Sequence, residues 1–277
     1  MKTYNDIYLE TRNALRASGI EGYTLEARLL VATAAGKSVA ELLRDINLYT
    51  TAAIDAEVQE LTRRRLAGEP VAYITGAWEF YGLPMKVTPD VLIPRMDTEL
   101  LVTTAKELLL GRKMDARILD LCCGSGCIAC ALGHELPATK LVALEIAREK
   151  FASNRLGSRA ICIQADATSS PPMSIGQFDM IVSNPPYIAS AEIMTLDASV
   201  RDYEPIWALD GGEDGYRFYK AIIKYWKSLL RPGGFLLFEV GEGQAATVKD
   251  MLSSAGFRAV GSRLDTLNIE RVVIGKM

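Results

Sequence analysis

The chain has 277 residues, a formal net charge of −3 and 49% hydrophobic residues, which is the composition of a globular protein with one large domain or two unequal ones. The near-neutral charge gives no electrostatic reason to expect nucleic-acid binding. No apolar run reaches the roughly 20 residues of a membrane span, and the opening residues MKTYND lack the apolar core of a signal peptide. We therefore expect a cytoplasmic protein with no membrane partner, and we expect it to be monomeric.

Residues 1–75 have the pattern of a small helical domain. The first predicted helix carries apolar and aromatic residues at helical spacing and ends at Gly19. Its buried face is expected to consist of Tyr4, Ile7, Tyr8, Thr11 and Leu15. Thr24 is placed to cap a second helix, which stops at Gly36.

Two more helices are predicted in this first domain. Ser38 and Glu41 have the spacing of a capping box, which marks the start of a helix. A fourth helix is expected to end near Gly68. Its apolar face consists of Ile54, Val58 and Leu61. The basic run RRR at 63–65 lies in this helix, and a solvated helix face explains it more simply than a partner site does.

Residues 76–90 are predicted to link this domain to the rest of the chain. The segment WEFYGLPMKV at 78–87 indicates a β-hairpin around a Gly-Leu-Pro turn. From residue 91 to residue 277, apolar strand patterns alternate with helical ones, which favours a doubly wound, mostly parallel α/β sheet. The expected strands are 117–122, 140–145, 160–164, 178–183, 235–240 and 270–274. The clearest helix, 216–230, is expected to stop at Pro232-Gly233-Gly234.

The end of the first predicted strand has the features of a cofactor site. In a doubly wound sheet, ligands bind at the carboxyl ends of the strands. This strand ends in DLCCGSG, where Gly124 and Gly126 allow the backbone to approach a ligand closely before the next helix begins. Glu145 ends the second strand, 21 residues beyond Gly124, where a carboxylate can bind both hydroxyls of a ribose.

The glycine pattern fits a nucleoside without phosphates better than a dinucleotide. A dinucleotide site would normally show GxGxxG, and no glycine stands at position 129. S-adenosylmethionine is therefore the favoured cofactor, with a dinucleotide as the alternative. Asp166 follows the third strand and is placed to meet the adenine amino group, although an aspartate that caps a turn would look the same. Acidic residues at two strand ends disfavour a phosphate and tolerate a cationic sulfonium.

Four of the five cysteines cluster in the segment CCGSGCIAC. They stand at positions 122, 123, 127 and 130, and the fifth stands at 162. A metal or iron–sulfur centre is one interpretation, but the odd number and the tight spacing suit reduced thiols that serve as small buried side chains. His134 is the only histidine, which argues against a zinc site built from cysteine and histidine. We expect no metal.

The tetrapeptide NPPY, 184–187, ends the fourth predicted strand beside the cofactor. Its two prolines lack amide hydrogens and restrict Asn184 to an extended backbone, which leaves carbonyl groups as acceptors. The Asn184 side-chain oxygen and the Pro185 carbonyl could each accept one hydrogen of a conjugated NH₂ group and stabilise the charge that develops on its nitrogen. Tyr187 could lie along a planar substrate or near the sulfonium. This pattern leaves open whether the NH₂ group belongs to an amide or to a nucleobase.

The chain resembles the release factor glutamine methyltransferases, the PrmC or HemK family, over about residues 68–257. Four segments carry the resemblance: GEPVAYITGAWEFYGLPMKVTPDVLIPR, DLCCGSGCIA, FDMIVSNPPYI and VRDYEPIWALDGGEDG. The hairpin followed by LIPR and a Thr-Glu pair is particular to this family, whereas the glycine turn occurs in many methyltransferases.

The resemblance implies a class I methyltransferase with a seven-stranded, Rossmann-like sheet in residues 91–277 and a helical substrate-recognition domain in residues 1–75. It implies methyl transfer from S-adenosylmethionine, with S-adenosylhomocysteine as product, to the side-chain amide nitrogen (N5) of a glutamine. That glutamine lies in the Gly-Gly-Gln motif of class-1 peptide chain release factors, so the activity modulates translation termination.

The resemblance also assigns residues to the two ligands. The cofactor residues are Cys122, Cys123, Gly124, Ser125, Gly126, Glu145, Asp166, Ala167 and Asn184. The substrate residues are Asn184, Pro185, Pro186 and Tyr187, with catalysis assigned to Asn184, Pro185 and Tyr187. Three positions depart from the family pattern: Asp97 stands in place of Glu, Cys122 in place of Gly, and Glu145 in place of Asp. Cys122 in place of Gly puts a close backbone contact at position 122 in doubt.

Three other functions remain open. A DNA enzyme that methylates amino groups shares the NPPY motif, but the segment 188–216 has seven acidic residues and one basic residue, which would repel phosphates. An enzyme that methylates a glutamine of a ribosomal protein uses the same chemistry, although the hairpin segment favours the release-factor branch. A non-catalytic scaffold is the third, and the intact NPPY motif and glycine turn argue against it.

Overall fold

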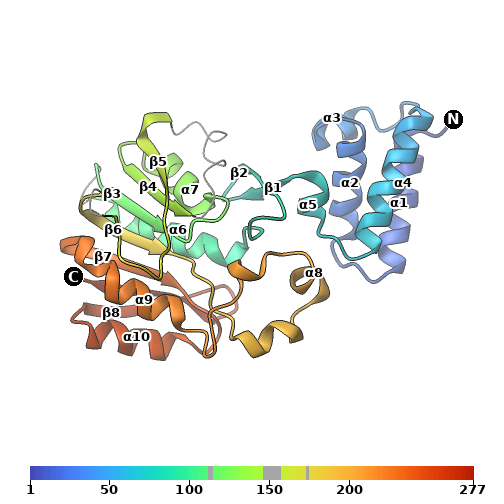
Figure 1. Ribbon diagram of the computed structural model, residues 1–277. Coiled ribbons are helices and arrows are strands. Elements are labelled where there is room, and N and C mark those ends of the chain that lie inside the picture. The colour runs from blue at the N-terminus through green and yellow to red at the C-terminus, as the bar shows by residue number, and fades with distance from the viewer. Residues whose placement is uncertain (112–114, 146–156, 173–174) are drawn as a thin grey trace. The chain divides into compact units, whose positions relative to one another are not determined.

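A computed structural model describes residues 1–111, 115–145, 157–172 and 175–277 (Figure 1). The chain divides into two compact units. The helical unit comprises Met1–Ala77, Val87–Pro89 and Asp197–Tyr203, and the sheet unit comprises Trp78–Lys86, Asp90–Leu196 and Glu204–Met277. A short segment from late in the chain thus belongs to the helical unit. The hydroxyl of Tyr203, in that segment, donates a hydrogen bond to the Ala67 carbonyl at 3.0 Å.

The helical unit is built from short amphipathic helices. They are α1 (Tyr4–Ala17), α2 (Tyr23–Ala34), α3 (Val39–Arg44), α4 (Ala52–Leu66), α5 (Val71–Thr75) and α8 (Ala198–Arg201). The five residues predicted for the inner face of α1 are all buried, which confirms that prediction. The capping box is confirmed as well, because the Ser38 hydroxyl accepts from the Glu41 amide at 3.2 Å and the Glu41 carboxylate accepts from the Ser38 amide at 2.8 Å. The cap predicted at Thr24 is wrong, since α2 already begins at Tyr23.

The three consecutive arginines at the end of α4 are all paired within the helical unit. Arg63 pairs with Glu60 at 2.6 Å, Arg64 with Glu69 at 2.5 Å, and Arg65 with Glu26 at 2.6 Å. Each pair opposes one positive charge with one negative charge at short range. The basic run therefore offers an acidic partner much less charge than its sequence indicates.

The predicted β-hairpin is present as β1 (Ala77–Phe80) and β2 (Leu83–Lys86). Its turn is formed by Tyr81 and Gly82, whose φ angles of 53° and 71° are both left-handed, as a type I′ turn requires. The turn thus shares only Gly82 with the Gly-Leu-Pro turn that the sequence predicted, and Leu83 and Pro84 fall inside β2. Phe80 and Met85 are buried in the core of the sheet unit, so the hairpin is anchored there.

A seven-stranded, mostly parallel sheet forms the centre of the sheet unit, which confirms the predicted fold class. Its strands are β3 (Arg117–Leu121), β4 (Lys140–Glu145), β5 (Ala160–Gln164), β6 (Phe178–Ser183), β7 (Leu230–Glu239), β8 (Arg258–Leu264) and β9 (Glu270–Lys276). Their order in the sheet is β5-β4-β3-β6-β7-β9-β8. The first five in this order run parallel, and β9 is antiparallel to both of its neighbours.

Three features of the carboxyl-terminal part differ from the sequence prediction. The strand β8 was not expected, because its sequence RAVGSRL has no clean alternation of apolar and polar residues. The helix expected over 216–230 is α9 (Arg217–Tyr225), followed by a 3₁₀ turn at Lys227–Leu229. The segment Pro232-Gly233-Gly234, which was expected to stop that helix, lies instead inside β7.

Helices cover both faces of the sheet (Figure 1). On one face lie α6 (Met96–Leu109) and α7 (Cys127–Glu135), and on the other lie α9 and α10 (Ala245–Ser254). Side chains alternate between the two cores along β3, where Ile118 faces the first core and Leu119 faces the second. Strands covered on both sides become nearly continuous apolar runs, which is why their pattern was visible in the sequence. Within the described residues, no helix combines the length and hydropathy that crossing a membrane requires.

The central strands β3 and β6 define the point at which ligands bind in this kind of sheet. They are neighbours, and from them the chain proceeds in opposite directions, through β4 and β5 on one side and β7 on the other. Their carboxyl ends are in register, with Leu121 opposite Ser183. Such a topological switch point leaves a crevice beyond the strand ends.

A buried tryptophan connects the α9 side of the fold to the loop after β5. Trp226 is fully buried, and its indole N–H donates to the Ala167 carbonyl at 2.9 Å. Replacing Trp226 by Phe would leave that buried carbonyl without its donor, so we expect a loss of about 1–3 kcal/mol in the free energy of unfolding. Unfolding in guanidinium chloride measures this loss in the free energy of unfolding. The matched variant Trp78→Phe, in the half-buried hairpin, should lose less, and equal losses would contradict the assignment.

Candidate functional site

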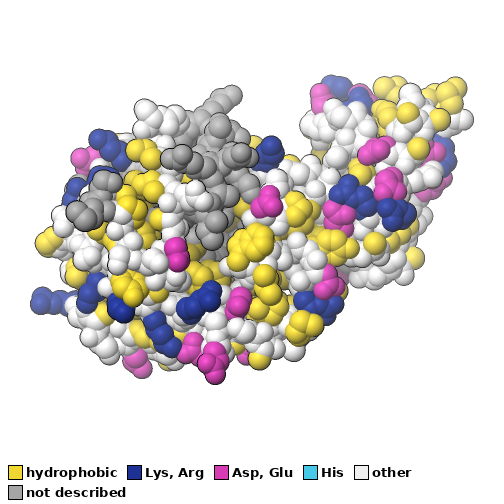
Figure 2. All heavy atoms as spheres, viewed as in Figure 1, with side chains coloured by type: hydrophobic (Ala, Val, Ile, Leu, Met, Phe, Trp, Pro, Cys, Tyr) yellow, Lys and Arg dark blue, Asp and Glu magenta, His cyan; other side chains and the backbone are white. Residues whose placement is uncertain are grey.

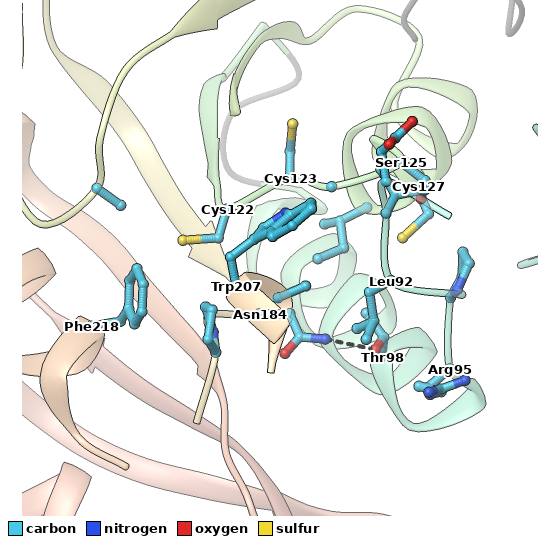
Figure 3. A pocket seen from close by; sticks show the side chains of 18 of the residues that line it. Leu92, Arg95, Thr98, Cys122, Cys123, Ser125, Cys127, Asn184, Trp207 and Phe218 are labelled. Carbon is cyan, nitrogen blue, oxygen red and sulfur yellow. Dashed lines mark hydrogen bonds between the residues drawn. The ribbon is translucent and has the colours of Figure 1, made fainter. Parts of the chain in front are cut away.

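A cavity of about 380 Å³ opens at the carboxyl ends of the central strands (Figure 3). This volume lies within the range of about 300–1,000 Å³ that is usual for small-molecule sites. All of its described lining residues belong to the sheet unit. They come from five segments: 90–98 at the start of α6, 122–128 after β3, 165–168 after β5, 184–186 after β6, and 207–218.

The turn after β3 has a backbone that is shaped for close approach. Cys122, Gly124 and Gly126 have φ angles of 59°, 51° and 75°, all in the left-handed region. A residue with a Cβ costs about 1–2 kcal/mol there, so Cys122 is strained. This strain is the physical reason why glycine would be the easier residue at position 122. Cys122, Cys123, Gly124 and Ser125 line the cavity, and Gly126 is the N-cap of α7.

A buried carboxylate holds the far end of this turn. Asp120, on β3, is fully buried, and its Oδ2 accepts from the Ala129 amide at 3.1 Å. Ala129 lies in the first turn of α7, where amide groups have no partner within the helix. A negative charge at this position also interacts favourably with the helix dipole.

Three of the four clustered cysteines are buried thiols, whereas Cys122 is half-buried and lines the cavity. Cys123, Cys127 and Cys130 are buried. Burial raises the pKa of the Cys127 thiol far above its usual range, so this thiol stays protonated and is a poor nucleophile. Among the residues that the structure describes, no three or more His, Cys, Asp or Glu side chains converge as a metal site would require.

The loop after β5 places Asp166 and Ala167 at the cavity. The Asp166 carboxylate accepts from the Thr168 amide at 2.8 Å and from the Thr168 hydroxyl at 2.7 Å. These hydrogen bonds lower the pKa of Asp166, so the group is ionised at neutral pH and can accept a further hydrogen bond. Glu145, predicted to bind a ribose, ends β4 opposite Gln164, but its side chain and residues 146–156 lie outside the described part of the chain.

Asn184 is the first residue after β6, and its side chain lies at the cavity wall. Its Nδ2 donates to the Thr98 hydroxyl at 3.1 Å, and Figure 3 shows its amide oxygen pointing away from Thr98. Thr98 is only 2% exposed and lies in the first turn of α6. This hydrogen bond engages the donor end of the amide and leaves the acceptor end available.

The remaining NPPY residues have different surroundings. Pro186 lines the cavity, whereas Pro185 and Tyr187 are not among its described lining residues. The Tyr187 carbonyl accepts from Gln244 Nε2 at 2.8 Å. It also lies so close to Gly215 that a Cβ there would come within 2.5 Å of this oxygen. Burial raises the pKa of the Tyr187 phenol, so it is neutral at physiological pH.

Several lining residues were not predicted from the sequence. They are Leu92, Arg95, Thr98, Trp207, Arg217 and Phe218. Three of them, Leu92, Arg95 and Trp207, lie in the LIPR and EPIWALDGG segments that carried the family resemblance, and Thr98 belongs to the Thr-Glu pair that follows LIPR. The resemblance was the only signal that could have found these four. Their distance from the glycine turn along the chain gives no indication that they border the same cavity.

Most acidic side chains of the segment 188–216 have an ion-pair or hydrogen-bond partner within the protein. The buried Glu204 pairs with Arg95 and accepts from the Ile93 amide at 3.2 Å. Four more have local partners: Asp197 with Ser199, Asp202 with Arg201, Asp210 with Ser190, and Asp214 with Lys220. Figure 2 shows acidic and basic side chains interspersed on the visible face. Cations offset the charges of three of these acids, Glu204, Asp202 and Asp214. The serine hydrogen bonds leave Asp197 and Asp210 ionised, so the repulsion of phosphates expected from the sequence is only partly reduced.

Glu239, at the end of β7, is a buried acid beside the site. It is 2% exposed. Its Oε2 has no hydrogen-bond partner among the described residues. Burial raises the pKa of Glu239 to about 7, and the charge of Asp97 acts in the same direction, while Arg271 opposes both. A carboxyl group in this environment is costly to ionise.

Two protein families and several individual proteins match this chain in sequence. Residues 6–76 match the PrmC N-terminal domain, and residues 96–199 match the methyltransferase small domain. The release factor glutamine methyltransferase of Geobacter sulfurreducens is 40% identical over 272 residues, which cover 96% of this chain and 94% of that protein. The one from Bradyrhizobium diazoefficiens is 40% identical over 250 residues, 87% of this chain and 83% of that protein.

A solved structure supports the same fold. The catalytic domain of hMettl16 superposes with a TM-score of 0.57 at 18% identity, covering 78% of this chain and 81% of that one. Identity this low bears on the fold alone. The sheet order, the cavity at the switch point and the matched domain together define a class I methyltransferase. With relatives this similar over nearly its whole length, the chain belongs to the release factor glutamine methyltransferase family.

The environment of Glu239 predicts a specific pH dependence of stability. Its pKa rises from an ordinary 4.5 to about 7 on folding, so folding takes up a proton between these pH values. The stability that this group contributes is present below pH 4.5 and is lost as the pH rises through 7. Glu239→Gln does not titrate, so its stability relative to the wild type should increase by as much as about 3 kcal/mol between pH 4.5 and pH 8.

Guanidinium unfolding of both proteins at the two pH values measures this difference. Glu242→Gln is the matched control, because Glu242 is exposed and lies only three residues away. Its stability relative to the wild type should be nearly the same at both pH values. A pH-independent difference for Glu239→Gln as well would show that the carboxyl group titrates normally in the folded protein.

Proposed function

We propose that this protein transfers a methyl group from S-adenosylmethionine to the side-chain amide nitrogen, N5, of the glutamine in the Gly-Gly-Gln motif of class-1 peptide chain release factors. The activity would modulate translation termination. Family membership supports this proposal. The observation that carries it is the orientation of Asn184, whose donor end bonds Thr98 while its carbonyl oxygen remains an acceptor at the cavity wall.

The described lining of the cavity fits the proposed cofactor. The left-handed turn of Cys122–Gly126 would hold its amino-acid end, and Asp166 and Ala167 would hold its adenine. Glu145 is assigned to the ribose. The bound cofactor supplies an electrophilic methyl group on a positively charged sulfur. Trp207 and Phe218 add aromatic surface to the lining, as is usual in small-molecule sites.

The residues at the acceptor end would orient and activate the glutamine amide. An amide nitrogen is a poor nucleophile because its lone pair is delocalised into the carbonyl group. Asn184 Oδ1 and the Pro185 carbonyl would each accept one hydrogen of the NH₂ group, which fixes the nitrogen and stabilises its developing positive charge. The proton can leave after transfer, so no strong base is required. Tyr187 would shape this end through its packing, since its phenol is buried and neutral.

Recognition of the release factor is assigned in part to the helical unit. The arginine run on α4 is neutralised by glutamates, so a recognition surface there would depend on shape and apolar contact more than on net positive charge. Tyr49 and Leu48 are 70% and 58% exposed in this unit and are available for such contact.

Substrate choice is tested by a methyl-transfer assay with tritiated S-adenosylmethionine. We expect label on a class-1 release factor, none on duplex DNA, and much less on a ribosomal protein offered at the same concentration. A release factor whose Gly-Gly-Gln glutamine is replaced by glutamate should take no label, since it lacks the NH₂ group. Label on DNA alone, or preferential label on the ribosomal protein, would overturn the proposed substrate.

Substitution of Asn184 tests the acceptor chemistry. Asn184→Ala removes one of the two carbonyl groups that bind the NH₂ hydrogens, so we expect kcat to fall by about 10²–10³-fold. The affinity for the cofactor, measured by calorimetry with S-adenosylhomocysteine, should change little, because most of its contacts are on the other side of the cavity. Turnover near the wild-type level would exclude Asn184 as an essential acceptor.

A further inference from the structure

The proposed acceptor groups recognise the NH₂ group of a glutamine but not the residues around that glutamine. Asn184 and Pro185 would bind the side-chain amide of any glutamine that reaches the cavity, so they do not select one glutamine of a protein. Because that side chain extends into the cavity, the backbone that carries it stays at the mouth. Selection for the neighbouring residues must therefore come from groups that border both the cavity and the solvent.

Trp207 is such a group. It lies in the 3₁₀ turn Ile206–Ala208, and its side chain lines the cavity although it is 55% exposed. Among the large apolar side chains that are exposed in the described part of the chain, it is the one that also lines this cavity. Figure 3 shows the indole between Cys123 and Asn184, which line the same cavity. A broad aromatic face thus stands at the mouth that a substrate must pass.

The segment that carries Trp207 is fixed to the fold on both sides. Before it, the carboxylate of Glu204 is buried and pairs with Arg95. After it, the Leu209 carbonyl accepts from the amide of Ile188, the residue that follows NPPY, at 3.1 Å. The indole is therefore held on an anchored segment before a substrate arrives, so little ordering of the backbone has to accompany binding.

We propose that Trp207 is a specificity-determining residue, whose indole face packs against the peptide planes of the two glycines that precede the glutamine. This inference rests on the proposed function, because it concerns the same substrate at the same site. Glycine has no Cβ, so its backbone can approach a flat surface closely. An aromatic ring offers that surface and a large contact area. A methyl group between the backbone and the ring would lift the chain from the indole and draw the amide nitrogen away from Asn184.

The exposure of Trp207 fits a protein substrate better than it fits the adenine of the cofactor. A small ligand is enclosed over most of its surface in a site of this kind. Ala167, which is assigned to the adenine, is correspondingly 5% exposed, whereas more than half of Trp207 faces solvent. A substrate that is itself a folded protein covers such a surface when it binds, and tryptophan is among the residues that contribute most at protein interfaces.

The test compares release factors that differ in one glycine of the motif. With the wild-type enzyme, we expect kcat/KM to fall by about 10–100-fold when the glycine next to the glutamine is replaced by alanine. With Trp207→Ala, kcat/KM on the natural motif should fall by about 10-fold, and the further loss on the alanine substrate should shrink to within about 3-fold. Trp207→Phe keeps a flat ring and should retain most of the wild-type preference.

Ile206→Ala is the matched control. Ile206 is the preceding apolar residue, is 58% exposed and is not among the described residues that line the cavity, so this variant should behave like the wild type with both substrates. The dissociation constant of S-adenosylhomocysteine, measured by calorimetry, should stay within about 2-fold in all three variants. Because both side chains are exposed, unfolding in guanidinium chloride should show nearly unchanged stability.

The outcomes separate this inference from the proposed function. If the wild type methylates the release factor and Trp207→Ala keeps the full preference for glycine, the inference is wrong and the proposed function stands. A wild-type enzyme that accepts the alanine substrate as readily as the natural one would also overturn the inference. So would a loss of S-adenosylhomocysteine affinity in Trp207→Ala with an unchanged glycine preference, since it would assign the indole to the cofactor. If the wild type methylates no release factor, the proposed function fails first.

Discussion

The site depends on the parallel pairing of β3 with β6. At the end of this pair, the buried Ser183 hydroxyl donates to the Leu121 carbonyl at 2.8 Å, so the two strands end together. The glycine turn begins one residue after Leu121, and Asn184 comes directly after Ser183. Two segments about 60 residues apart in the chain therefore emerge side by side. A shift of either strand by one residue would move its motif away from the cavity and reverse its side chains.

A second constraint is that several backbone and side-chain donors at this edge already have acceptors. The Asn184 NH₂ group bonds Thr98, the Ala129 amide bonds Asp120, and the Thr168 amide bonds Asp166. The prolines of NPPY have no amide hydrogen to contribute. At Asn184 the carbonyl oxygen is left as the unengaged end of the amide, because the NH₂ group is held by Thr98.

The sequence predicted features that depend on neighbours along the chain. The inner face of α1, the capping box at Ser38, the apolar strands and the two motifs at strand ends all follow from local pattern. It did not predict contacts made by distant segments. Thr98 stands 86 positions from Asn184, and no periodicity links them. Backbone geometry was also hidden, since the strained φ of Cys122 follows from the turn and not from the residue. The edge strand β8 was missed because solvent on its outer side removes the apolar signal.

The hydrogen bond from Tyr203 to Ala67 affects how the two units could be exchanged between members of the family. Residues 197–203 lie in the loop that follows NPPY, yet they pack as part of the helical unit. A chimaera that replaces residues 1–77 alone would pair foreign helices with a native loop, and removal of those residues would leave the loop without its support. The natural unit of exchange is the helices together with residues 197–203. Changes in the helices and in this loop are therefore expected to be inherited together, although more than a hundred residues separate them in the chain.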